Sequence, residues 1–363
     1  MSRRNVSVLA VIVTAVLALA PTAFGQGQWT IATADGKSSL GIGFLSQLQY
    51  EGIDNADASH TQQNLFFRRL RLMLGGKIND KLTFFFDTDD PNLGKGQTTG
   101  SKVDTTMYIQ DFFLTYTVSN AFKIDGGMLL VPVSHNSQQG ATTLLALDYG
   151  PFTFQHSTPL NSNVGRDYGI QARGYVADNH VEYRALLLQG NRGTTAQNPL
   201  RETFRLVYYP FDADTGFFYT GTFFGKKKIV AIGATYDMQQ QYKSYSGDAV
   251  VDVPVGKDAF TAQFDYTKFD GGATFKTLPQ EDQYLGEAGF YFSSIKLEPF
   301  VQYAKLTYAT ETPTYLNQNK LMAGFIWWGN GHKFNIKVAA AQIKKDLTPD
   351  RKQFVVQWQV LAW

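Results

Sequence analysis

The chain has 363 residues, no cysteine, 33 glycines and 14% aromatic residues. This length suits one large all-β unit or two smaller domains, and the lack of cysteine excludes disulfide bonds. After residue 20 no apolar run approaches the ~20 residues that a membrane-spanning helix requires, so the sequence excludes helical membrane spans.

Residues 1–25 have the composition of a secretory signal peptide. Arg3 and Arg4 precede an apolar run over 6–20, and residues 23–25 offer small side chains for cleavage. Without this segment, 31 basic residues balance 31 acidic ones, and no nucleic-acid partner is expected. We expect three parts: the signal peptide at 1–25, a short periplasmic segment at 26–37 and a single β-barrel domain at 38–363.

From residue 38 onward, apolar and polar residues alternate in short segments, as they do in strands with one buried face. In the hairpin at 166–191, Asp167 and Arg173 share one face, whereas Tyr168 and Ile170 share the other. In a soluble sheet the apolar face would be the core, but in an outer-membrane barrel it faces lipid and the charged face lines a wet lumen. The alternating segments are 38–50, 64–78, 82–89, 108–116, 123–132, 166–176, 180–191, 201–208, 230–236, 249–254, 260–267, 284–292, 297–308, 321–327, 334–340 and 354–363.

The lengths of the connections between the strands are a second indication of an outer-membrane barrel. Short connections at 79–81, 119–121, 177–179, 293–295 and 329–331 mostly alternate with longer ones at 91–104, 133–165, 239–246, 268–282 and 309–318. Short periplasmic turns and long external loops are typical of outer-membrane barrels, although residues 210–228 are long where a short turn is expected. The sequence therefore predicts an all-β transmembrane antiparallel β-barrel of about 16 strands. Aromatic residues at strand ends suit the two interfacial girdles: Tyr50, Phe66, Phe67, Tyr208, Tyr209, Phe217, Phe218, Tyr219, Trp327, Trp328 and Trp363.

Several segments, in order, resemble the phosphate-selective porin O/P family of outer-membrane channels. They are FRRLRLMLGGKINDKLTFFFDTD, YIQDFFLTY, KIDGGMLLVPVS, RDYGIQARGY, VEYRALLLQGN, GHKFNIKVAAAQI and FVVQWQVLAW, and the likeness covers residues 38–363. The resemblance implies a trimeric barrel of 16 strands in which the third long loop, residues 133–165, folds inward as a constriction. It also implies that lumenal arginines draw anions in and that lysines near the constriction bind them.

The loop at 133–165 has no Lys or Arg before its end and offers only His135, Asp148 and His156. The candidates for pore-lining and anion-binding groups therefore lie on the wall: Arg69, Arg71, Arg173, Arg184, Arg201 and Arg205. Acidic residues expected in the same lumen are Asp87, Asp89, Asp111, Asp125, Asp167, Glu182 and Asp265. Arginine suits an anion site because its fork holds an oxyanion at any relevant pH. In the alternative interpretation, the arginines pair with these acids and stiffen the barrel.

No catalytic pattern is evident, since both H-E-x-x-H and G-x-S-x-G are missing. Ser134-His135 and His156-Ser157 could serve a hydrolase with Asp148, but neighbours in an extended chain rarely face each other. The run at 87–90 lacks the glycine and distal glutamate of an EF-hand calcium loop. We expect no enzymatic activity, no cofactor and no metal site.

In the last strand, the alternation of residues does not settle which face Trp363 lies on. Phe354, Val356, Trp358 and Val360 share one parity and Trp363 has the other, so a bulge near Val360 would turn Trp363 outward. We expect Trp363 to be the terminal aromatic residue that the barrel-assembly machinery recognises, a role that the resemblance supports.

The predicted function is that of an outer-membrane porin for small hydrophilic solutes, with a preference for phosphate or other small anions. A general or weakly cation-selective pore is the alternative, and an adhesive or binding barrel is a further one. The expected partners are the lipid bilayer and lipopolysaccharide, the barrel-assembly machinery, small solutes or anions and, by the resemblance, two further copies in a homotrimer.

Overall fold

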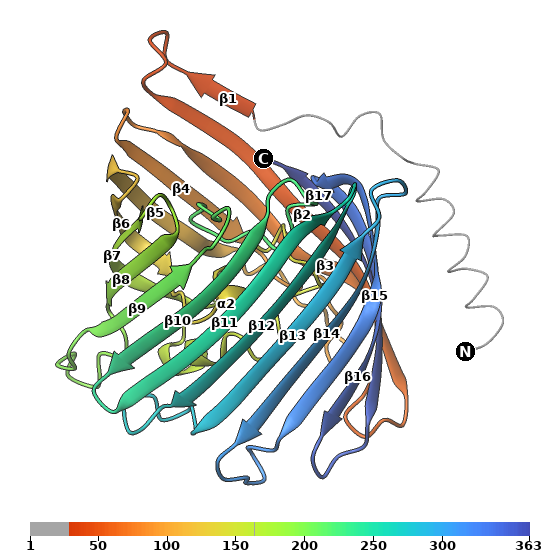
Figure 1. Ribbon diagram of the computed structural model, residues 1–363. Coiled ribbons are helices and arrows are strands. Elements are labelled where there is room, and N and C mark those ends of the chain that lie inside the picture. The colour runs from red at the N-terminus through yellow and green to blue at the C-terminus, as the bar shows by residue number, and fades with distance from the viewer. Residues whose placement is uncertain (1–28, 163) are drawn as a thin grey trace.

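Sixteen antiparallel strands form a closed barrel in the computed structural model, which describes residues 29–162 and 164–363 (Figure 1). The signal peptide predicted at 1–25 lies outside the described residues. The strands of the barrel are β2 (Ser39–Asp54), β3 (Thr61–Lys77), β4 (Leu82–Asp89), β5 (Tyr108–Ser119), β6 (Phe122–Leu130), β7 (Arg166–Val176), β8 (Val181–Leu188), β9 (Arg201–Tyr208), β10 (Ile229–Gln239), β11 (Tyr242–Val255), β12 (Asp258–Asp270), β13 (Glu281–Tyr291), β14 (Leu297–Tyr308), β15 (Gln318–His332), β16 (Phe334–Lys345) and β17 (Arg351–Ala362).

Every strand of the barrel pairs with the strands before and after it in the chain, and β17 closes the barrel on β2. Closure satisfies the backbone hydrogen-bonding groups of all strands, as a bilayer requires. An additional strand, β1 (Trp29–Ala32), pairs with residues 39–42 at the start of β2. The predicted antiparallel barrel of about 16 strands is confirmed.

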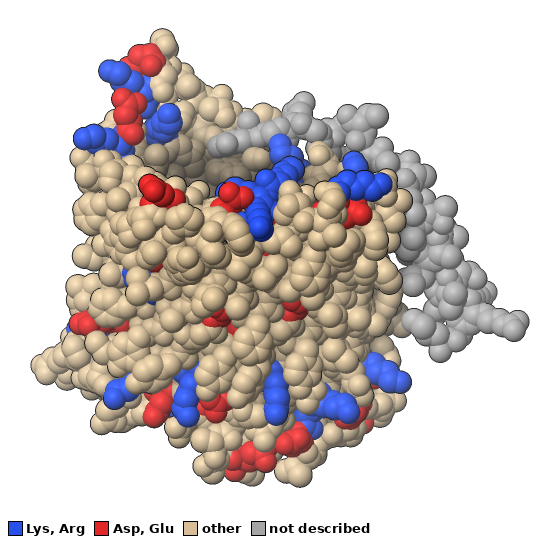
Figure 2. Space-filling model, viewed as in Figure 1, with Lys and Arg blue, Asp and Glu red and all other residues tan. Residues whose placement is uncertain are grey.

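The apolar face of the strands is the exposed one. In β7, Tyr168 and Ile170 are 57% and 56% exposed, whereas Asp167 and Arg173 are buried inside the barrel. Figure 2 shows charged side chains gathered toward the two ends of the barrel, with a largely uncharged band between them. Such a band is the surface that a membrane covers. Among the described residues, no helix is long and apolar enough to cross a membrane.

The two ends of the barrel differ in their connections. At one end, the short-turn end, the connections include residues 78–81, 120–121, 177–180 and 256–257; at the other, the long-loop end, they include 90–107, 131–165, 189–200 and 271–280. The long connection predicted at 239–246 is wrong. The chain turns at residues 240–241, and β11 runs from Tyr242 to Val255.

Two connections run inside the barrel. The first, here called the inward loop, is residues 131–165; it contains the helical turn α2 (His135–Gln138) and the 3-10 helix η1 (Gln155–Leu160), and α2 lies within the barrel in Figure 1. The second, here called the inward segment, is residues 209–228 and enters from the short-turn end. This segment is the long connection that interrupts the predicted alternation of short turns and long loops.

The prediction that aromatic clusters form girdles is only partly right. In the pairs Tyr208–Tyr209 and Trp327–Trp328 the second member is buried, with Tyr209 and Trp328 no more than 1% exposed. Neighbouring residues of a strand point to opposite faces, so an aromatic doublet supplies one ring to the membrane and one to the lumen.

Candidate solute pathway

The inward loop bonds to separate parts of the wall. The backbone N–H groups of His135 and Asn136 donate to Asp248 and Asp265 over 3.2 and 3.0 Å. The ammonium group of Lys337 on β16 donates to the carbonyls of Leu144 and Ala146 over 2.9 and 2.7 Å. The loop is therefore held inside the barrel by side chains of the wall that point inward.

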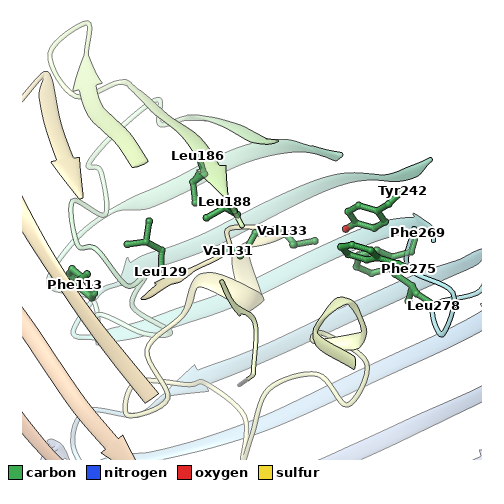
Figure 3. Close-up of a cluster of buried hydrophobic side chains, with 10 residues drawn as sticks. All are labelled: Phe113, Leu129, Val131, Val133, Leu186, Leu188, Tyr242, Phe269, Phe275 and Leu278. Carbon is green, nitrogen blue, oxygen red and sulfur yellow. The ribbon is translucent and has the colours of Figure 1, made fainter. Parts of the chain in front are cut away.

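Apolar packing holds one part of the inward loop near the long-loop end of the barrel. Figure 3 shows Val131 and Val133 beside Leu186 and Leu188, with a second group farther along the wall. That second group contains Tyr242, Phe269, Phe275 and Leu278, and the rings of Tyr242 and Phe275 stack at 4.0 Å between centroids. This cluster is one of four buried apolar clusters among the described residues.

The inward segment is fixed to the wall by arginine, acid and ring contacts. Arg184 donates to the carbonyls of Phe217 and Gly216, and the ring of Phe217 stacks on Phe113 at 4.0 Å. The hydroxyl of Tyr219 donates to Glu182 over 3.1 Å and accepts from Arg205 over 3.2 Å.

The inward loop and the inward segment meet inside the barrel. Gln139 and Tyr219 form an isolated parallel bridge, in which the N–H of Tyr219 donates to the Gln138 carbonyl and the N–H of Gly140 donates to the Tyr219 carbonyl. The ring of His135 stacks on that of Tyr219 at 4.7 Å. The two segments, which enter the barrel from opposite ends, therefore meet and together obstruct the lumen.

Titratable groups at this junction are shifted because they are buried. Burial lowers the pKa of His135 to about 3, although Asp248 opposes the shift, and neither ring nitrogen has a hydrogen-bond partner. Burial likewise raises the pKa of Asp214 in the inward segment to about 6, against two backbone N–H donors.

All six predicted anion-binding arginines face the lumen, and each has a carboxylate partner. We call this part of the wall, on β3 to β10, the arginine wall. Its nitrogen–oxygen distances are 2.6 Å for Arg69–Asp148, 3.1 and 2.9 Å for Arg71 with Asp87 and Asp89, 2.7 Å for Arg173–Asp125, 2.5 Å for Arg184–Glu182, 2.5 and 3.4 Å for Arg201 with Asp237 and Asp167, and 2.6 Å for Arg205–Asp248. Arg166, which the sequence analysis did not single out, pairs with the predicted lumenal acid Asp111 at 2.8 Å.

The adjoining part of the wall carries buried acids without basic partners among the described residues. This carboxylate wall consists of Asp252, Asp265, Glu281, Glu287 and Glu298 on β11 to β14, and none of the five forms an ion pair among the described residues. Amide and indole N–H groups bond to them instead: Gln302 donates to Glu287 over 2.9 Å and Trp328 to Glu298 over 2.6 Å. Four of these acids were missed, although each has the inward parity of its strand.

A cavity of about 120 Å³ remains between the arginine wall, the inward loop and the inward segment. We call it the inner cavity. Its charged lining is Arg71, Asp87, Asp111 and Arg166, and its aromatic lining is Phe85, Tyr149, Phe218 and Trp363. The space thus has an ionic side and an apolar side.

The bulge predicted near Val360 is wrong, because β17 keeps an unbroken register with both neighbours. Trp363 therefore keeps its inward parity, and its indole packs against Phe85 at 5.7 Å between ring centroids. Gly43 and Gly75 leave room for it: a Cβ at these positions would lie 2.6 and 2.9 Å from the indole. Whether Trp363 is the residue that the assembly machinery recognises stays a prediction.

The candidate hydrolase residues have structural partners. Ser134 caps α2, Asp148 binds Arg68 and Arg69, and the Ser157 hydroxyl accepts from the Gly165 N–H. Within the described ranges, no hydrogen bond links a serine of this set to His135 or His156, and no group of three or more His, Cys, Asp or Glu residues could hold a metal ion.

The comparisons with known proteins agree with the barrel. Residues 41–218 match the family model described as Phosphate-selective porin O and P. No curated protein sequence matches the chain. The fold is similar to an anion-selective porin from Comamonas acidovorans, with a TM-score of 0.59, 11% identity and coverage of 90% of this chain and 100% of that chain.

Two further solved structures have the same fold. OmpF of Salmonella typhi, in complex with daunomycin, has a TM-score of 0.59, 14% identity and coverage of 91% of this chain and 100% of that one. The trimer form of OmpT from Vibrio cholerae has a TM-score of 0.54, 11% identity and coverage of 89% and 99%. Family and fold indicate a channel rather than an enzyme. The chain is therefore a porin-fold β-barrel of the bacterial outer membrane, and its residues 41–218 carry the sequence pattern of the phosphate-selective porin O and P family.

Proposed function

We propose that this porin lets small hydrophilic solutes diffuse passively across the outer membrane, with a preference for phosphate or other small anions. The lumenal arginines are the observation that carries the proposal, and the guanidinium groups of Arg71 and Arg166 reach the inner cavity beside the carboxylates of Asp87 and Asp111. Fixed charge at a low-dielectric wall sets the ionic preference of such a channel. The family description and the anion-selective neighbour give further support.

The inward loop would narrow the passage, with the short-turn end facing the periplasm. Three copies would form the working unit, a proposal supported by the resemblance to trimeric OmpT. The membrane partners would be lipopolysaccharide outside the barrel and, during insertion, the assembly machinery that recognises Trp363.

A weakly cation-selective pore is the second candidate, and the carboxylate wall favours it. Five buried acids without basic partners would make that side of the lumen negative when they are ionised. The two candidates differ in the sign of the selectivity, so one electrical measurement separates them.

The test is the conductance of the purified protein in a planar bilayer under a salt gradient, with phosphate titrated against chloride. The proposal expects a reversal potential that favours anions and a chloride current that phosphate blocks. Combined Arg69→Ala and Arg71→Ala changes should relieve the block. A cation-favouring potential would establish the second candidate, and a total lack of conductance would contradict both.

A further inference from the structure

The outer face of the adjacent strands β4 to β8 carries no charged residue. In these strands every acidic and basic side chain has the inward parity, and the outward positions hold apolar residues, glycine and one threonine. Phe112, Tyr168 and Ile170 on this face are 47%, 57% and 56% exposed. We call this sector of the wall the uncharged face.

The outer face of β10 to β14 is different, because it ends in tyrosines and lysines near the long-loop end. The rings of Tyr236 and Tyr245 lie 4.9 Å apart between centroids, and those of Tyr266 and Tyr284 lie 5.1 Å apart. On β11, β12 and β14, a lysine follows two residues beyond an outward tyrosine, toward the long loops: Lys243, Lys268 and Lys305. Figure 2 shows charged side chains along this lower edge of the barrel. Tyrosine and lysine side chains suit a lipid–water boundary, since each has an apolar stem and a polar tip.

The uncharged face has no such boundary at the long-loop end. The outward residues nearest that end of its five strands are Thr88, Ile109, Met128, Tyr168 and Leu187. None of them is a lysine, and only one is a tyrosine. This sector therefore lacks the anchoring side chains that the outer face of β10 to β14 offers to the surface of a membrane.

The wall is also low along the uncharged face. β4 and β8 have eight residues each and β6 has nine, whereas β11, β12 and β15 have 14, 13 and 15. A tilted strand needs about 9–11 residues to cross the hydrocarbon core of a bilayer. β4 and β8 fall short of that length, so lipid is a poor neighbour for this sector.

A second copy of the same chain is the neighbour that fits. It presents an equally low and uncharged sector, so the two surfaces match in height and in charge. In a closed ring of three identical subunits, each copy contacts the other two through one sector of its wall. Five adjacent strands of the 16 form one such continuous sector. The trimer form of OmpT, which has the same fold, supports this occupant.

We propose that the uncharged face of β4 to β8 is the surface through which three copies of the chain contact one another, and that β6, the middle strand of the sector, lies nearest the threefold axis. The tyrosines and lysines of β10 to β14 then face the lipid. This inference rests on the proposed function, because it gives the proposed trimer its contact surface.

The first test measures how close lipid comes to each face. The chain has no cysteine, so a single introduced cysteine can carry a fluorescent label. Ile170→Cys on β7 labels the uncharged face, and Phe264→Cys on β12 is the matched control, because both residues lie near the middle of their strands and are 56% and 50% exposed. In vesicles with nitroxide-labelled lipids, we expect strong quenching of the label at residue 264 and a loss of that quenching at residue 170. Equal quenching at both sites would overturn the inference.

The second test places a charge on each face. Native mass spectrometry of the purified protein in detergent should give the mass of three chains for the unmodified protein and for Phe264→Lys. Ile170→Lys should shift the mass to that of one chain, because its ammonium group would be buried without a partner between two copies. A trimer that survives Ile170→Lys would contradict the assignment. The quenching test does not depend on the folding of this variant.

The outcomes also separate the inference from the proposed function. A stable trimer with strong quenching at residue 170 would place the contact elsewhere and leave the proposed trimer standing. Single chains in the unmodified protein would overturn both the trimer and its contact surface, and bilayer conductance by those chains would leave the diffusion function standing.

Discussion

The arginine wall and the carboxylate wall bury polar groups at similar depth in different ways. Arg205 on the first is 1% exposed, and Asp248 holds it at 2.6 Å. Glu287 on the second is 4% exposed and has the neutral amide of Gln302 at 2.9 Å. An ion pair is costly to break because the remaining charge stays buried, whereas a carboxyl held by an amide can lose its charge at little cost. The charges of the arginine wall are therefore fixed by their pairing, whereas the carboxyl groups of the carboxylate wall can gain or lose a proton.

The largest expected effect follows from removal of one member of a pair on the arginine wall. Arg205→Ala leaves Asp248 buried without its guanidinium, and we expect the free energy of unfolding to fall by about 3–5 kcal/mol. Urea unfolding in lipid vesicles, followed by tryptophan fluorescence, measures it. The double change Arg205→Met with Asp248→Leu should recover most of the loss. Lys102→Ala, at an exposed position in the connection between β4 and β5, is the control and should cost less than about 0.5 kcal/mol.

A smaller loss is expected where the arginine wall meets the inward segment. Tyr219→Phe removes the hydroxyl that links Glu182 and Arg205, and the free energy of unfolding should fall by about 1–2 kcal/mol. Tyr208→Phe, on a ring that is 52% exposed on the outer face, is the control for the same chemical change. Equal effects of both substitutions in the urea assay would contradict a specific role for the Tyr219 hydroxyl.

His135, which lies against the arginine wall, should make the free energy of unfolding depend on pH. Its pKa is about 3 in the folded protein and 6.5 as the ordinary value, so below pH 6.5 the unfolded chain binds a proton that the folded chain does not. The free energy of unfolding should therefore fall as the pH drops from 6.5 toward 3, by up to roughly 1.4 kcal/mol per pH unit from this group.

The variant His135→Phe keeps a ring against Tyr219 and should weaken that pH dependence. Urea unfolding at pH 7.5 and pH 4.5 measures the difference. An unchanged dependence in the variant would show that other groups cause it.

The smallest effect on stability is expected on the carboxylate wall. Glu287→Gln keeps the shape and an acceptor for Gln302, so the free energy of unfolding should change by less than about 1 kcal/mol. The same variant should move the bilayer reversal potential toward anions, because it removes a negative charge from the lumen. The matched change Asp237→Asn, beside Arg201, should destabilise the protein far more. Similar losses from both variants would remove the distinction between the walls.

The alternation of residue types made most of the barrel predictable, because each strand has one face in lipid and one in the lumen. The first half of β11 escaped prediction for the same reason. Its inward residues Ser244 and Ser246 contrast little in polarity with the outward Lys243 and Tyr245. A strand without such contrast has no period-two signal, whatever its partners in the sheet.

The pairing of the lumenal arginines was left open by the sequence, because it depends on the register of neighbouring strands and on the inward loop. Arg69 binds Asp148, which is 79 residues away in the chain. The inward segment was detectable, since its length and its run Phe217-Phe218-Tyr219 were both visible. For Trp363, simple parity gave the right face, and the added bulge was the error.

Hydrogen bonds in the middle of the inward loop join it to the seam of the barrel, where the first and last strands pair. Gln47 on β2 donates to Gln359 on β17 across the line where the barrel closes, and the two side chains also donate to the carbonyls of Ala141 and Thr142. The loop can complete these contacts only after the first and last strands have met. The last hydrogen bonds of the inward loop therefore depend on the junction between the first and last strands of the barrel.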